Sequence, residues 1–290
     1  MCDKASFAVA SIKDDTHSFI AYYDDTMLEA AIKYKTIVDE FDDAIKAGEF
    51  KMYLQPQISA KTRRLTGAEA LVRRIKPDGT IISPIDFIPV YEKSGLISRL
   101  DRYIWEQAAA KLGEWKKAGI NMSISVNISP KDFYYIDIFN TFAGLIKKYD
   151  IEPSNLKIEI TETTIMSDVP NLMGELEELR KAGFTLEMDD FGSGYSSLNT
   201  LKDINVDVLK VDMGFIKETK NVKKSRIILA SVIKMAKELN LLIITEGVET
   251  EEQVDNLTKL GCDVFQGYYF SKAIDVNEFE KRYLYRKKAG

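Results

Sequence analysis

The sequence contains a single histidine, His17, and only two cysteines, Cys2 and Cys262. A Ser-His-Asp or Cys-His mechanism would therefore depend on one residue near the N-terminus. A zinc site built from histidine and cysteine ligands is excluded for lack of ligands. Two distant cysteines are typical of a reducing compartment, so we expect a cytoplasmic protein. An enzyme of this composition would work with carboxylates, lysine and metal ions that prefer oxygen ligands.

Long apolar runs and an excess of positive charge are also missing. No apolar stretch approaches the roughly 18 residues that a membrane-spanning helix needs. The N-terminus lacks a basic stretch followed by a long apolar core, so we expect no signal peptide. The formal net charge is −5, whereas general nucleic-acid-binding proteins are usually basic, so we expect neither DNA nor RNA as a partner. This charge leaves open a small nucleotide bound through metal ions.

What is present suits an ordinary globular protein. The chain has 290 residues, of which 45% are hydrophobic and 29% charged, enough for one large domain or two small ones. Residues 1–45 read as a short strand followed by a long amphipathic helix that ends near Gly48, and a helical linker is the simplest interpretation. Over residues 46–285 we expect a second domain, in which strands alternate with helices.

Eight segments have the composition of strands, and most are separated by helical stretches that end at a glycine suited to a helix C-cap. The predicted strands are residues 51–59, 65–73, 123–129, 156–161, 184–190, 207–212, 241–247 and 263–270. Repeated strand–helix units predict an α/β fold with a mostly parallel sheet, and eight strands fit a TIM (β/α)₈ barrel. Because residues 60–64 are too few for a helical crossover, we expect an antiparallel first strand, giving a modified barrel.

The predicted strands are not continuously apolar, as parallel strands covered by helices usually are. Apolar and polar residues alternate, and alternate residues of a strand point to opposite faces. In the strand at 156–161, for example, Ile158 and Ile160 oppose Lys157 and Glu159. The apolar face should pack against the helices, so the polar face should line the barrel lumen.

Acidic, amide and lysine side chains stand late in successive strands, at the carboxyl ends where barrel enzymes build their active sites. These residues are Glu69, Asn127, Glu159, Asp189, Asp190, Lys210, Asp212 and Glu246. So many carboxylates at one mouth repel one another unless protons or cations compensate. All-oxygen ligands favour Mg²⁺ or Mn²⁺, and the adjacent Asp189 and Asp190 could serve two such ions. Gly192 and Gly194 would let the next loop turn tightly.

Each of these features has a simpler explanation when it is taken alone. A single acidic residue at a strand end is usually solvated or caps a helix. Lys210 could be one half of an internal salt bridge, and a Gly-Ser-Gly loop is more often a turn than a phosphate site. The argument for a site depends on repetition, because a solvated surface would not end at least five successive strands with acidic or amide residues.

The ordered motifs of the chain resemble those of EAL-domain cyclic di-GMP phosphodiesterases. The segment GAEALVR (67–73) resembles the family signature, and the likeness runs from about Glu49 to Leu284. It includes YLQPQ (53–57), SVNIS (125–129), EITE (159–162), DDFGSGYSSL (189–198), LKVD (209–212), EGVET (246–250) and QGYYFSK (266–272). The resemblance implies a modified barrel with an antiparallel first strand. It also implies hydrolysis of cyclic di-GMP to linear pGpG, with two Mg²⁺ or Mn²⁺ ions per site.

The resemblance also assigns roles to individual residues. The implied metal ligands are Glu69, Asn127, Glu159, Asp189, Asp190 and Glu246, with Asp189 bridging the two ions. The implied catalytic residues are Glu69, Asp189, Glu246 and Lys210, of which Lys210 would contact the attacking water. The implied substrate-binding residues are Gln55, Leu71, Gln266 and Arg73, the last through a phosphate. Glu162 would steady the loop after the aspartates, and Asp212 and Glu249 would support the metal ligands.

Two residues depart from the usual family pattern. Arg74 stands where many members have tryptophan, and Ala273 stands where a proline often follows FSK. The N-terminal segment resembles the end of a GGDEF domain with its connecting helix, although the GGDEF motif is missing. We therefore expect the EAL part of a longer GGDEF–EAL protein with regulatory domains. Family members often dimerise near the barrel mouth, so we also expect a homodimer.

Three functions are compatible with these residues. The first is an active phosphodiesterase, which is favoured because every implied metal ligand is present. The second is a catalytically inactive cyclic di-GMP receptor that signals through a partner, and the retention of Glu69, Asp189, Lys210 and Glu246 argues against it. The third is a metal-dependent barrel hydrolase acting on another phosphodiester, which the family motifs make the weakest of the three.

Overall fold

The computed structural model of the protein describes residues 5, 9, 22–167, 169, 171–192, 201, 202, 204–212 and 222–285. Most of the predicted N-terminal strand lies outside these residues, as does the loop that follows Gly192, with Gly194. The chain divides into two compact units, one of residues 1–50 and 73–96 and the other of residues 51–72 and 97–290. The domain boundary expected after residue 45 stays a prediction.

The smaller unit is organised around buried aromatic rings. The single long helix expected before Gly48 is two helices, α2 (Asp25–Asp39) and α3 (Phe41–Lys46). The strand β3 (Ile81–Ile82) and the helix α4 (Pro84–Ser94) complete the unit. Its core contains Phe41, Phe50, Phe87 and Tyr91, whose ring centroids lie 4.9 to 6.0 Å apart. Because these rings are large and rigid, they supply a compact core to a unit with few residues.

Arg74, one of the two departures from the usual family pattern, is buried in this unit with only 3% of its side chain exposed. Its Nη2 donates to Glu40 Oε2 at 2.7 Å and its Nε donates to Glu49 Oε2 at 2.9 Å. The guanidinium also lies over the ring of Phe50. One planar cation therefore ties the strand β2 (Leu65–Ile75) to the junction between α2 and α3.

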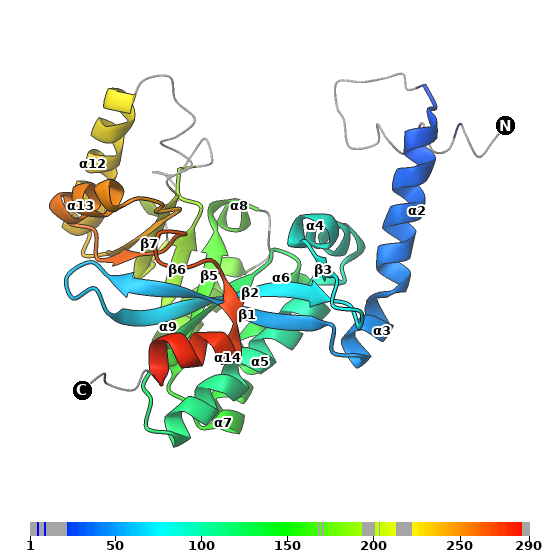
Figure 1. Ribbon diagram of the computed structural model, residues 1–290, viewed down its shortest axis with the longest axis horizontal. Helices are drawn as coiled ribbons and strands as arrows, with labels where there is room; N and C mark the ends of the chain where they lie inside the picture. Colours follow the sequence, from blue (N-terminus) through cyan, green and yellow to red (C-terminus); the bar gives the residue numbers. More distant parts are fainter. Residues whose placement is uncertain are drawn as a thin grey trace. The chain divides into compact units, whose positions relative to one another are not determined.

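The larger unit is the barrel (Figure 1). Besides β2, its strands are β1 (Phe50–Ser59), β4 (Ile124–Ile128), β5 (Leu156–Thr161), β6 (Leu186–Asp189), β7 (Val208–Asp212), β8 (Leu242–Glu246) and β9 (Val264–Phe265). Each strand from β2 to β9 in this series pairs in parallel with the next. β1 pairs antiparallel with β9, and its pairing with β2 closes the sheet. The predicted eight-stranded barrel with an antiparallel first strand is confirmed.

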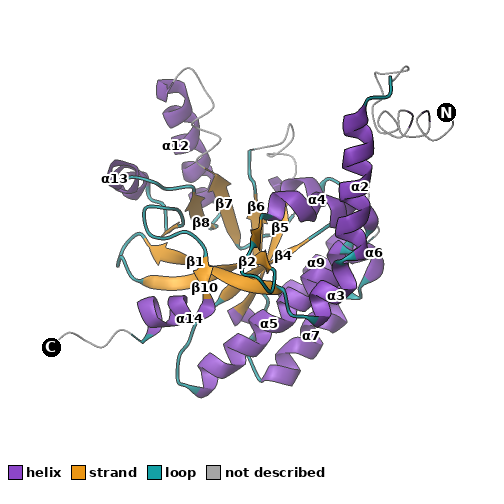
Figure 2. Ribbon diagram, turned by 45° about the vertical axis from the view of Figure 1, so that its right-hand side comes forward, coloured by secondary structure: helices purple, strands orange, loops and turns teal. Residues whose placement is uncertain are grey.

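Helices cover the outside of the strands (Figure 2). The described helices of this unit are α5 (Ile97–Lys117), α6 (Asp132–Tyr135), α7 (Ile138–Tyr149), α8 (Glu162–Ile165), α9 (Leu172–Lys181), α12 (Val222–Glu238), α13 (Glu251–Leu260) and α14 (Val276–Phe279). Short helical turns span Pro153–Asn155 and Glu280–Leu284. α5 packs on β4 and β5, and α7 contacts both α5 and α9. Among the described helices, none is both long and apolar enough to cross a membrane.

The alternation along each strand separates an apolar outer core from a polar lumen. Ile158, Ile160 and Leu186 are fully buried. On the opposite face, Lys210 of β7 lies 3.5 Å from Glu69 of β2, and these two strands are not neighbours in the sheet. Such a contact must cross the barrel, so the polar faces point inward. The expectation of a polar lumen is therefore confirmed.

The last predicted strand is much shorter than expected, because β9 contains only two residues of the segment 263–270. After Phe265 the chain bends back on the loop that follows β8, where Val248 N donates to Gln266 O and Tyr269 N donates to Val248 O. The additional strand β10 (Ile274–Asp275) pairs with β1 instead. A tight turn thus replaces the second half of the predicted strand.

Gly267 makes this turn possible, because a Cβ there would lie 2.8 Å from the Val248 carbonyl carbon and closer still to its nitrogen and oxygen. We expect Gly267→Ala to lower the free energy of unfolding by roughly 2–3 kcal/mol, as other overpacked sites do. Chemical denaturation measures this change. Gly144→Ala is the matched control, since nothing lies within 4 Å of a Cβ there. That helical substitution should raise stability by up to about 1 kcal/mol. Equal effects of the two variants would contradict the prediction.

Candidate active site

Neighbouring parallel strands bring the predicted polar residues to one end of the barrel. Strand pairing sets Asn127 beside Glu159, and Glu246 beside Asp212. The same register places Asp189 beside Thr161 on β5. These positions lie at or near the carboxyl ends of β4 to β8, the end at which barrel enzymes carry their sites. The fold therefore brings Asn127, Glu159, Asp189 and Glu246 to the same end of the barrel.

The ammonium of Lys210 is the centre of this mouth, and its side chain is completely buried. Its Nζ lies 2.8 Å from Glu246 Oε1 and 2.9 Å from Glu159 Oε2. The same atom lies 3.4 Å from Asp189 Oδ1 and 3.5 Å from Glu69 Oε2. Four carboxylates from four strands thus converge on one cation, and they outnumber it in charge.

Amide side chains hold one side of this cluster. Gln266 Nε2 donates to Glu69 Oε2 and, at 3.2 Å, to Gln55 Oε1. Asn127 Nδ2 donates to the other oxygen of Glu69 at 3.4 Å. Gln57, a buried residue that the sequence reasoning missed, donates from Nε2 to Gln266 Oε1 at 3.2 Å. Its position could have indicated this contact, because residues two apart in a strand share a face and Gln57 is two residues after Gln55.

The electrostatics of the mouth follow from burial and like charge. Burial raises the pKa of Glu246 to about 8, with Asp189 and Glu69 adding to the rise. Burial and the charge of Glu69 also raise the pKa of Glu159 well above its ordinary value. Burial would lower the pKa of Lys210, but Glu159 and Glu246 outweigh it and raise that pKa well above its ordinary value. Unless further cations bind, some carboxyl groups of this cluster therefore stay protonated, and Glu159 and Glu246 are the ones with clearly raised pKa values.

The donor set fits a hard divalent cation. The ligating atoms available are carboxylate and amide oxygens, which Mg²⁺ and Mn²⁺ prefer. Glu159 Oε1 is buried and has no hydrogen-bond partner in the part of the chain that the structure describes. However, no group of three acidic, histidine or cysteine side chains among those residues is arranged to hold a metal ion. The carboxylates contact Lys210 instead, and its ammonium compensates part of their negative charge.

The remaining predicted residues lie around this centre. Asp190 has a positive φ of 55°, and its backbone N donates to Asp189 Oδ1 at 2.9 Å. Burial, followed by the charge of Asp189, raises the pKa of Asp190. Glu162 is buried, and its Oε2 accepts from Gly192 N at 3.4 Å, next to the predicted loop. These contacts place Asp189, Asp190 and Glu162 near the start of the loop that follows Gly192.

The other four predicted residues lie on segments around the mouth. Asp212 is exposed at the end of β7, and Glu249 lies in the turn before α13, where its backbone N donates to Gln253 Oε1. Leu71 is half-buried on β2. Arg73 is half-buried and belongs to the smaller unit. Their predicted roles stay predictions.

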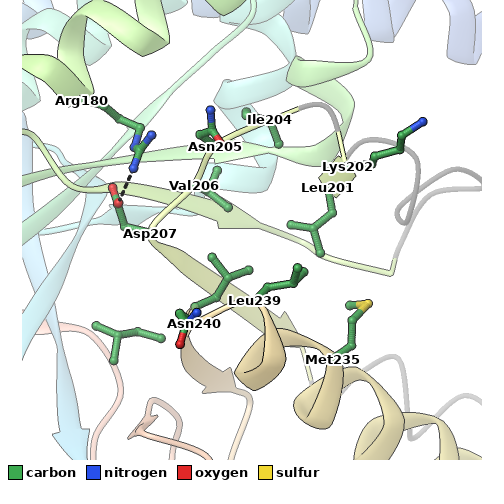
Figure 3. Close-up of a pocket in the computed structure, with 12 residues that line it drawn as sticks. Arg180, Leu201, Lys202, Ile204, Asn205, Val206, Asp207, Met235, Leu239 and Asn240 are labelled. Carbon is green, nitrogen blue, oxygen red and sulfur yellow. Dashed lines mark hydrogen bonds and ion pairs between the residues drawn. The ribbon is translucent and has the colours of Figure 1, made fainter.

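A cavity of about 740 Å³ lies at the opposite, amino-terminal ends of β6 to β8 (Figure 3). Leu201, Ile204 and Leu239 are among its apolar lining residues, and Arg180 Nη2 donates to Asp207 Oδ1 there at 3.3 Å. Asp207 also accepts from Leu186 N, so it joins strand ends. Among its described lining residues Asp207 is the single carboxylate, and its ion pair with Arg180 serves the fold.

The barrel and its acidic mouth define a class of carboxylate-rich α/β barrels, and comparison with known proteins gives the family. The family model of the EAL domain matches residues 38–273. The chain therefore belongs to the EAL-domain family, which includes cyclic di-GMP phosphodiesterases.

The chain spans less than half the length of the two curated relatives described next. It is 34% identical over 278 residues to the signaling protein YkoW of Bacillus subtilis, covering 96% of the chain and 35% of YkoW. It is 30% identical over 275 residues to the bifunctional diguanylate cyclase/cyclic di-GMP phosphodiesterase MucR of Pseudomonas aeruginosa, covering 94% of the chain and 40% of MucR. A solved structure of the PaMucR phosphodiesterase in complex with c-di-GMP matches with a TM-score of 0.78 and 32% identity, over 84% of this chain and 99% of that one.

The raised pKa of Glu246 predicts how stability depends on pH when metal is removed. Between the ordinary value of 4.5 and the folded value of about 8, the folded state holds a proton that the unfolded state has lost. In EDTA, the free energy of unfolding should therefore fall as pH rises from 5.5 to 7.5, by about 1.4 kcal/mol per pH unit for each such proton.

Chemical denaturation at several pH values measures this slope. Glu246→Gln should make the slope shallower by about 1.4 kcal/mol per pH unit, which is the contribution of one proton. Glu238→Gln, on the exposed surface of α12, is the matched control and should leave the slope unchanged. A native slope that Glu246→Gln does not alter would contradict the prediction.

Proposed function

We propose that this chain is a cyclic di-GMP phosphodiesterase that hydrolyses one phosphodiester bond to give linear pGpG. The observation that carries the proposal is the convergence of Glu69, Glu159, Asp189 and Glu246 on the buried Lys210 at the carboxyl ends of the strands. Membership of the EAL-domain family supports the choice of substrate. The similar MucR phosphodiesterase structure is a complex with the same nucleotide, which supports the choice further.

Two Mg²⁺ or Mn²⁺ ions belong to this proposal. The residues that would hold them are Glu69, Asn127, Glu159, Asp189, Asp190 and Glu246, with Asp189 serving both. When bound, such ions lower the pKa of a coordinated water and compensate charge on the phosphoryl oxygens. Because Glu246 and Glu159 have raised pKa values in the metal-free state, binding of the cations would release protons.

The protein's own residues would orient the reactants. Lys210 stays an ammonium, since its pKa is raised well above the ordinary value. It therefore acts as a hydrogen-bond donor that orients the attacking oxygen, and it does not accept the proton of the water. Arg73 would bind a substrate phosphate as a bidentate donor. Leu71, Gln55 and Gln266 would line the substrate pocket, and Gln55 and Gln266 are already joined by a hydrogen bond.

Glu162, Asp212 and Glu249 are assigned supporting roles in this proposal. Glu162 would order the loop after the aspartates through its contact with Gly192. Asp212 and Glu249 would support the ligands of the metal ions. We also propose that the chain is cytoplasmic, forms a homodimer and works as the EAL part of a longer protein with regulatory domains.

A second function, that of an inactive receptor for cyclic di-GMP, is favoured by one observation. Lys210 Nζ lies within 3.5 Å of an oxygen of each of the four carboxylates, so a cation of the protein itself already compensates part of their charge. A receptor would bind the nucleotide beside this ion-pair cluster without cleaving it. Binding without turnover at saturating Mg²⁺ or Mn²⁺ would identify this function.

Removing the metal ions, or the negative charge of Asp189, tests the proposed phosphodiesterase activity. We expect the native chain to convert cyclic di-GMP to pGpG with Mg²⁺ or Mn²⁺, as followed by chromatography, and to lose this activity in EDTA. Asp189→Asn preserves the shape of the side chain but removes its charge, so turnover should fall by roughly 100-fold or more. Asp255→Asn, on the exposed side of α13, is the matched control and should retain activity. Turnover that survives exhaustive EDTA treatment would refute the metal-dependent mechanism.

A further inference from the structure

A second polar layer lies beneath the Lys210 centre, inside the barrel. Glu187 of β6 is completely buried, and its Oε1 accepts from Lys157 Nζ of β5 at 2.9 Å. Its Oε2 accepts from Ser125 Oγ of β4, also at 2.9 Å. This Ser125–Glu187–Lys157 group, the inner layer, consists of residues to which the proposed function assigns no role.

The inner layer directly adjoins the mouth. Strand pairing sets Glu187 beside Glu159, whose carboxylate is an ion-pair partner of Lys210. Glu187 also pairs with Val208 of β7, and Lys210 lies two residues further along that strand, on the same face. Glu187 is therefore a neighbour of Lys210 in the lumen, although its ion pair is with Lys157.

This arrangement creates competition for one ammonium. Four carboxylates of the mouth already share Lys210, and Glu187 on the adjacent strand would be a fifth anion near it. A buried carboxylate without a cation is strongly unfavourable, so it draws the nearest positive charge toward itself. Lys157, with 19% of its side chain exposed, supplies that charge from the other side of Glu187.

We propose that Lys157 is a positioning residue for Lys210: by pairing with Glu187, it leaves the Lys210 ammonium directed at the four carboxylates of the mouth. The inference rests on the proposed function, in which Lys210 orients the attacking oxygen. Removal of Lys157 alone leaves Glu187 unpaired and pulls Lys210 inward, out of its place. Removal of both charges of the inner pair leaves Lys210 where it is.

Four variants of the full chain test this: Lys157→Met, Glu187→Gln, the double variant of both, and Lys181→Met as control. Lys181 is an exposed lysine of α9 with an ion-pair partner, so its loss matches the change of charge. Three quantities are measured on each: kcat and KM for cyclic di-GMP with Mn²⁺, the affinity for Mn²⁺ alone by calorimetry, and unfolding in EDTA.

Lys157→Met should lower kcat by roughly 10- to 100-fold with little change in KM, since a misplacement of about 1 Å has effects of this size. Its affinity for Mn²⁺ should rise, because the carboxylates of the mouth lose a compensating cation. The double variant should recover most of kcat and return to the native Mn²⁺ affinity. A general structural defect would instead lower kcat and Mn²⁺ affinity together.

Three results would overturn the inference: an unchanged kcat in Lys157→Met, a fall in Mn²⁺ affinity parallel to that in kcat, or a folded double variant without recovery. Failure of the proposed function is separate, because it would show as absent turnover in the native chain. In that case, the Mn²⁺ affinities of the variants would test whether Lys157 positions Lys210. If Mn²⁺ does not bind either, unfolding in EDTA decides: Lys157→Met must destabilise the chain and Glu187→Gln must reverse that loss.

Discussion

The buried ammonium of Lys210 is the interaction on which the rest of the site depends. Without a cation, four carboxylates could not share one end of a barrel, because their mutual repulsion and desolvation would exceed what the packing offers. The residues that surround it come from β2, β5, β6 and β8. One charge therefore fixes the relative positions of side chains that are far apart in the sequence.

Much of this could be predicted from the sequence, because two simple periods carry the information. Alternation within Leu156–Thr161 separated the outer face from the lumen, and the strand–helix repeat placed the polar residues at one mouth. What could not be predicted depends on contacts between distant segments. The division of the N-terminal helix at Glu40, the short β9 and the Lys157–Glu187 pair each follow from partners that local patterns do not specify.

The polar lumen has a consequence for stability. A typical barrel fills its interior with branched apolar side chains, whereas this one buries Glu159, Glu187 and Lys210 there. Such groups contribute little net stability even when they are paired. The apolar layer between strands and helices, including Trp105 packed near Phe142, must therefore supply most of the favourable burial. The barrel separates these tasks by face: the outside of each strand stabilises the fold, and the inside is available for chemistry.

The Arg74 ion pairs give the smaller unit a mechanical property. Arg73 and Arg74 are consecutive residues of β2, so their side chains point to opposite faces of the strand. Arg74 is bound to Glu40, which stands between α2 and α3. A rotation of α2 would therefore pull on the strand one peptide unit away from Arg73. The Arg74 guanidinium therefore couples the junction of α2 and α3 to the carboxyl end of β2, and displacement of either segment would break buried ion pairs.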